Sequence, residues 1–196
     1  MFKYRAAAIT VAMGIVLFGG LALAPSHRGV VRTTAGRNLL PASAGMDARF
    51  AFLARQTSNR CALQPQTLMK MSALRRLQGS CCDPMALSAY RWQVQALHTY
   101  RSIWQIPSDP YDVPVALAQR LLTYDRSVRL SSAQAGAYTA AMEMSRLKGP
   151  CCCRCWRWYA FRGLSKYLLT DRAWPPARLA ALTSQIEGCG GLAERA

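Results

Sequence analysis

The sequence predicts an all-α protein: an N-terminal membrane helix, a flexible tether, and a compact bundle of about five to six helices stapled or capped by clustered cysteines. Three observations predict this class. An uncharged segment stands near the start, apolar residues then recur at helical spacing, and most of the eight cysteines lie beside expected helix ends. No stretch alternates apolar and polar residues as a strand would. The expected boundaries are 1–24 for the membrane segment, 25–46 for the tether, 47–191 for the helical domain and 192–196 for a tail.

The first segment is long enough to span a bilayer. Residues 6–24 carry no charge and follow Lys3 and Arg5. At about 1.5 Å per residue they extend about 28 Å, close to the hydrocarbon thickness of about 30 Å, whereas a secretory signal has an apolar region of only about 7–15 residues. Pro25 also disfavours cleavage directly after this segment. We therefore expect a retained anchor, with the domain on the extracytoplasmic side; the domain would be secreted if cleavage occurred near Pro25.

The next residues and the overall charge limit the expected partners. Residues 25–46 are rich in Gly, Ser, Thr, Pro and Arg, which is typical of a tether. The net charge of +16 comes from 25 basic and 9 acidic residues, and the basic residues are scattered along the chain. The absence of a run of like charges argues against a nucleic-acid-binding arm and favours a compositional bias. The expected partners are the membrane, through residues 6–24, and either an anionic lipid or another protein.

Six helices are expected after the tether, most of them opened by a proline or an N-capping residue. Asp83 and Pro84 resemble an N-cap with proline at the first helical position, and Ser131 with Gln134 fits a capping box. Glycines stop several of the helical patterns. The first expected helix begins at Pro65 and ends before Gly79, the second covers 83–103, and the third begins at Pro114. The last three cover 131–149, 150–170 and 175–188.

One connection is too long and too rich in proline to be an ordinary helix–helix loop. Residues 104–113 contain Pro107 and Pro110. Extended, ten residues reach about 33 Å, enough to carry the chain back along a helix. The starts of the second and fifth expected helices and the end of the sixth would then meet at one end. This arrangement would bring Cys81 or Cys82 within reach of one of the cysteines at 151–155.

The cysteines are the most specific feature of the chain. Most of them lie beside expected helix ends and next to glycines, which let the backbone approach a shared centre. Thiolates are ligands for soft metals such as Cu(I). The candidate metal ligands are Cys81, Cys82, Cys151, Cys152, Cys153, Cys155 and Cys189.

The sequence leaves three interpretations of these thiols open. Structural disulfides are favoured, because paired cysteines oxidise outside the cytosol; such a stapled domain could bind a partner and perform no chemistry. Binding of a soft metal such as copper is the functional hypothesis. Thiol–disulfide exchange through Cys152 and Cys155 is the third, since we expect this C-x-x-C at a helix N-terminus near Arg154 and Arg157. No βαβ setting, catalytic triad, pair of carboxylates or phosphate loop is present, so no catalytic residue is predicted and a non-enzymatic protein is favoured.

Overall fold

The structure, a computed structural model, describes residues 45–191. The expected membrane segment, nearly all of the expected tether and the tail lie outside these residues. Within the described range, no helix is long and apolar enough to cross a membrane. The elements in chain order are α1 Met46–Leu53, α2 Pro65–Met69, β1 Arg76–Gln78, α3 Leu87–Leu97, the 3-10 helix η1 His98–Tyr100, β2 Asp112–Pro114, α4 Val115–Ser127, α5 Ser132–Met144, α6 Trp156–Asp171 and α7 Pro176–Gln185.

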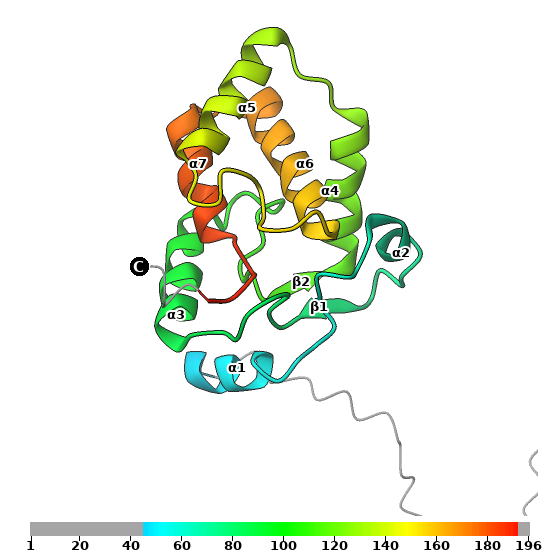
Figure 1. Ribbon diagram of the computed structural model, residues 1–196, viewed down its shortest axis with the longest axis vertical. Helices are drawn as coiled ribbons and strands as arrows, with labels where there is room; N and C mark the ends of the chain where they lie inside the picture. The colour runs from blue at the N-terminus through cyan, green and yellow to red at the C-terminus, as the bar shows by residue number, and fades with distance from the viewer. Residues whose placement is uncertain (1–44, 192–196) are drawn as a thin grey trace, which may run out of the picture. The chain divides into compact units, whose positions relative to one another are not determined.

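Most of the described chain is helical, which confirms the predicted class in its coarse form (Figure 1). The expectation of no strands was wrong. β1 and β2 pair antiparallel, with the fully buried side chains of Leu77 and Val113 opposite each other. Strands of three residues are too short to show an alternating pattern. The helix expected from Pro65 to just before Gly79 accordingly stops at Met69, and Leu74, which lies within the expected range, is exposed.

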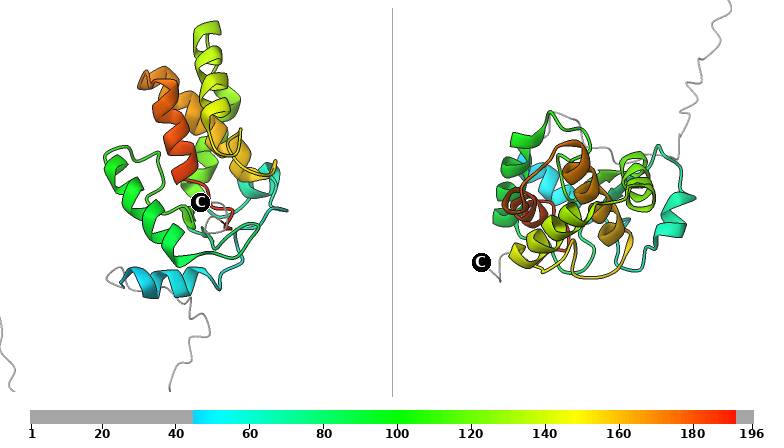
Figure 2. Two further views of the ribbon diagram at one scale, coloured as in Figure 1. Left: turned by 60° about the vertical axis from the view of Figure 1, so that its left-hand side comes forward. Right: turned by 90° about the horizontal axis from the view of Figure 1, so that it is seen from above.

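Four helices, α4 to α7, form the main packing layer and surround the larger apolar core (Figures 1 and 2). α6 packs most extensively against α4, and α5 packs against α7. Gly163 of α6 permits the close contact with α4, because a Cβ there would lie 2.0 Å from the carbonyl oxygen of Leu121. The capping box of Ser131 and Gln134 at the start of α5 is confirmed.

The long connection, residues 104–113, returns to β1, which precedes α3 in the chain. The backbone N–H of Gly79 donates to the carbonyl of Tyr111 (2.9 Å), and that of Val115 donates to the carbonyl of Arg75 (3.0 Å). Residues 104–113 therefore carry the chain back to β1, as their length predicted. The expected helix start at Asp83 was wrong, because α3 begins at Leu87 after the N-cap Ala86.

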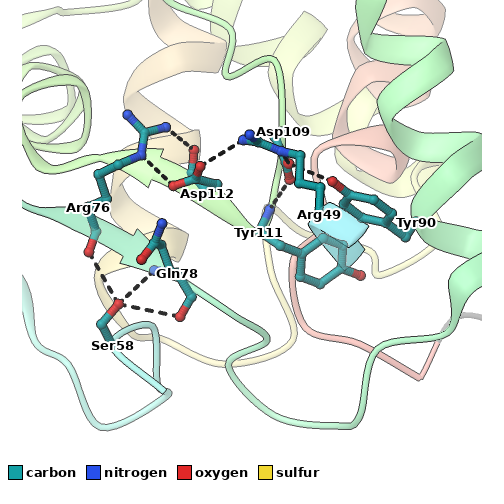
Figure 3. Close-up of polar contacts among 8 residues, drawn as sticks. All are labelled: Arg49, Ser58, Arg76, Gln78, Tyr90, Asp109, Tyr111 and Asp112. Carbon is teal, nitrogen blue, oxygen red and sulfur yellow. Dashed lines mark hydrogen bonds and ion pairs between the residues drawn. The ribbon is translucent and has the colours of Figure 1, made fainter. Parts of the chain in front are cut away.

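Buried carboxylates hold α1, a helix that the sequence analysis missed, against β2 (Figure 3). Arg49 of α1 donates to Asp109 (2.8 Å) and to Asp112 (2.7 Å). Asp109 also accepts from the Tyr90 hydroxyl (2.9 Å), and Asp112 from the guanidinium of Arg76. α1 thus depends on contacts with residues about sixty positions away, which no local pattern encodes.

Candidate metal centre

Four separate segments bring the cysteines together. The first holds Cys61, whose backbone N–H donates to the carbonyl of Cys81 (3.2 Å). The same segment is tied to the start of α6, because the backbone N–H of Trp156 donates to the carbonyl of Leu63 (2.9 Å) and its indole donates to buried Asn59 (3.1 Å). These bonds fix the segment of Cys61 between the second segment, which holds Cys81 and Cys82, and the third, residues 151–155, which directly precede α6.

The glycine-rich segment after α7 lies beside the segment of Cys81 and Cys82. Cys81 donates its backbone N–H to the carbonyl of Gly188 (3.2 Å), and Asp83 donates to that of Cys189 (2.7 Å). Gly190 has a φ of +78°, and a Cβ there would lie 2.0 Å from the carbonyl oxygen of Asp83. Only glycine permits this close approach in that backbone conformation. Asp83, which we expected to cap a helix, instead aligns Cys189 with Cys81 and Cys82.

The third segment, residues 151–155, is an irregular turn. We expected it to be the first turn of a helix, and that expectation was wrong: α6 begins at Trp156, with Cys155 as its N-cap residue. Cys151 and Cys155 therefore do not share a helix face. Figure 1 shows this turn as the yellow coil between α5 and α6, close to the red coil that follows α7.

The sulfurs of these segments are in mutual contact. The prediction that Cys81 or Cys82 meets the later run is confirmed, because Cys82 and Cys152 have sulfurs 3.5 Å apart. All eight thiols are free, and no described pair lies near the S–S bond length of about 2.05 Å. The remaining sulfur–sulfur contacts are Cys61–Cys153 at 2.9 Å, Cys152–Cys189 at 3.1 Å, Cys151–Cys189 at 3.3 Å and Cys81–Cys82 at 3.6 Å.

The eight sulfurs form four sets of three, in each of which all sulfurs lie within 4.8 Å of one another. We call these sets the triads. The structure adds Cys61, which was not among the candidate ligands that the sequence predicted. The triads are Cys61–Cys81–Cys82, Cys81–Cys151–Cys189, Cys82–Cys152–Cys189 and Cys151–Cys153–Cys155.

Two of the buried sulfurs favour the thiolate form. Hydrogen bonds from Cys151 and then Cys81, together with the positive charge of Arg157, lower the pKa of Cys189 to about 3. A hydrogen bond from Cys155 lowers the pKa of Cys151 to about 7. The donor Cys81 has a raised pKa, because its hydrogen bonds to Cys151, Cys155 and Cys189 hold its proton. Negative charge in the centre is therefore concentrated at Cys189.

The other shifted thiols retain their protons more strongly than usual. Partial burial is the largest cause at each, and it raises the pKa of Cys82 to about 12. Partial burial also raises the pKa of Cys152, and a hydrogen bond with Cys189 raises it further. The pKa of Cys153 is raised in the same way by partial burial and by a hydrogen bond with Cys61. A metal would therefore have to displace protons from these sulfurs, so that binding becomes tighter as the pH rises.

A buried cation lies beside the centre. Arg157 is fully buried, donates to the carbonyls of Pro110 (2.6 Å) and Ile186 (3.3 Å), and lies against Gly188, where a Cβ would be 2.5 Å from the guanidinium carbon. The ion pairs among the described residues do not include it. The thiolate of Cys189 is thus a source of the negative charge that a buried guanidinium requires.

Comparison of the chain with protein-family models, with curated proteins and with solved structures gives no match. The fold and the site therefore define the class on their own. It is a mostly helical domain in which four distant segments bring eight free cysteines into one centre.

Proposed function

We propose that the protein binds soft metal ions, Cu(I) in particular, in a centre of several ions held by all eight cysteines. The observation that carries this proposal is the arrangement of the eight sulfurs in four overlapping triads. Four separate disulfides would need only four isolated pairs. A set of ions that share bridging thiolates needs sulfurs that belong to more than one ligand set, and Cys81, Cys82, Cys151 and Cys189 each belong to two.

The number of sulfurs in each set favours Cu(I) over zinc. With metal–sulfur bonds about 2.3 Å long, a tetrahedral site requires four sulfurs about 3.8 Å apart, and a trigonal site requires three about 4.0 Å apart. Among the described residues the mutually close sets contain three sulfurs, not four. Cu(I) is a soft ion that accepts three thiolates. We therefore assign each triad as a candidate trigonal Cu(I) site.

The buried charge of Arg157 supports a thiolate centre rather than a fully oxidised one. Four disulfides are neutral, and they would leave the guanidinium buried without the negative charge of Cys189. An uncompensated buried charge costs several kcal/mol. Thiolates in excess of the Cu(I) charge would make the centre anionic and would complement this cation.

A stapled domain is the second candidate, and one observation favours it. The sulfurs of Cys61 and Cys153 are in contact at 2.9 Å, so this pair could oxidise with little rearrangement. Thiol exchange through Cys152 and Cys155 has less support, because Cys155 is 1% exposed and the sulfurs in contact with Cys152 are those of Cys82 and Cys189.

The proposal includes a location. We propose that residues 6–24 anchor the protein in a membrane and that residues 25–46 hold the thiol centre on the extracytoplasmic side. The uncharged length of the first segment supports this placement.

Cu(I) titration of the full chain, solubilised in detergent and reduced under anaerobic conditions, tests the function. We expect native mass spectrometry to detect up to about four bound Cu(I) ions, one for each triad, and these ions should resist removal by bathocuproine disulfonate. Zn(II) should bind less tightly, because the close sets offer three sulfurs and not four. Four disulfides in protein isolated from its native membrane, with no Cu(I) retained after reduction, would contradict the proposal and leave the stapled domain.

A further inference from the structure

The eight thiols differ strongly in their access to solvent. Cys151, Cys155 and Cys189 are 1–3% exposed, whereas Cys82 and Cys152 are the exposed members of the set. The two exposed residues come from different segments, but their sulfurs are 3.5 Å apart. The centre therefore has one two-thiol edge at the surface and a buried interior.

This edge is connected to the interior by shared sulfurs. Cys82 and Cys152 form a triad with the buried Cys189, which is also a member of the triad of Cys81 and Cys151. Cys151 belongs in turn to the triad of Cys153 and Cys155. Neighbouring triads thus have one ligand in common, and an ion can move between them by exchanging the other two ligands.

We infer that Cys82 and Cys152, which we call the exchange edge, pass Cu(I) between this centre and an external carrier that holds the ion through two thiolates. This inference rests on the proposed Cu(I) binding and assigns to the same centre a role in metal transfer. Its ligand class is a dithiol-bound Cu(I) ion. The exposed pair matches such a carrier, because two thiolates on each side allow a ligand-by-ligand handover.

The transfer is a substitution in which no electron changes hands. The Cys82 sulfur forms a bond to the carrier's Cu(I), one carrier sulfur leaves, and the proton from Cys82 passes to that sulfur through solvent. Cys152 then displaces the second carrier thiolate in the same way. Cys189 completes the trigonal set, and the carrier departs as a free dithiol.

Loading kinetics of the reduced full chain test this role, with a Cu(I)–dithiothreitol complex as the donor. The variant Cys82→Ser/Cys152→Ser removes the exchange edge, and Cys61→Ser/Cys153→Ser removes a less exposed pair in sulfur contact. We expect the edge variant to load at least about tenfold more slowly, while mass spectrometry still detects ions in the remaining triads. The control variant should lose capacity but load at a rate close to that of the unchanged protein.

A second measurement requires no substitution and covers the case in which the edge variant fails to fold. Limited alkylation of the reduced protein should modify Cys82 and Cys152 first, and the modified protein should load slowly. Equal loading rates for the edge variant or the alkylated protein and for the unchanged chain would overturn the exchange edge. Failure of the unchanged chain to retain Cu(I) would instead overturn the proposed function itself.

Discussion

Arg157 is the single residue on which the charge of the centre depends most. Its guanidinium is fully buried, is held by two backbone carbonyls and contributes to the low pKa of Cys189. Gly188 leaves the space for it, which gives a physical reason for the glycine before Cys189. A buried cation beside a cluster of sulfurs stabilises the thiolate form of that cluster, and thiolates are the ligands that soft metal ions prefer.

Replacement of Arg157 by methionine removes the charge and retains much of the volume. We expect the pKa of Cys189 to rise and the affinity for Cu(I) to fall about tenfold or more, because the anionic centre loses its buried counter-charge. Competition with bathocuproine disulfonate measures the affinity. Arg157→Lys is the matched control, and it should retain part of the affinity because it retains the charge. Unchanged affinity in the methionine variant would indicate that the centre is neutral.

At the scale of the elements, the contact between α4 and α6 determines where the cysteine turn emerges. α6 follows directly on Cys155, so its position against α4 fixes the end of the turn at 151–155. The contact is close at Gly163, where a Cβ would meet the backbone of Leu121 and would lie 2.8 Å from the backbone nitrogen of Asp125. The neighbouring Arg162 pairs with the Asp125 carboxylate and strengthens the same contact.

Substitution of Gly163 by alanine should destabilise the protein although alanine is the better helix former. The added methyl group would overlap the backbone of α4, and we expect the free energy of unfolding to fall by about 1–3 kcal/mol. Chemical denaturation followed by circular dichroism measures the change. Gly136→Ala in α5 is the matched control, because its added Cβ would meet no atom within 4 Å outside its chain neighbours and its own helix backbone, and it should stabilise by up to about 1 kcal/mol. A Gly163 variant as stable as the control would refute the close contact.

At the scale of the whole molecule, the location decides whether the thiols meet an oxidising or a reducing environment. Protein reporters fused after Ser43 test the proposed anchor. We expect the reporter to be active only on the extracytoplasmic side and the fusion to remain in the membrane fraction after an alkaline wash. Mature protein that begins near Pro25 would change the anchor into a cleaved signal, and reporter activity in the cytosol would contradict the location.

The sequence by itself determined the helical class and several helix starts, because proline, capping residues and apolar spacing act over a few residues. The capping box at Ser131 and the first turn of α2 at Pro65 are examples. The long connection with Pro107 and Pro110 also predicted correctly that Cys81 or Cys82 would reach one of the cysteines at 151–155, as Cys82 does at Cys152. Local chemistry and chain length were sufficient for these conclusions.

The tertiary structure alone decided the composition and form of the centre. Cys61 joins it through a backbone bond to Cys81, twenty residues further along the chain. The turn at 151–155 is irregular because it is packed between three other segments, although the sequence by itself favours a helix there. The sequence placed Arg157 near the thiols, but its complete burial and its contact with Gly188 came only from the structure. Contacts between distant residues fix these features, and no local pattern records such contacts.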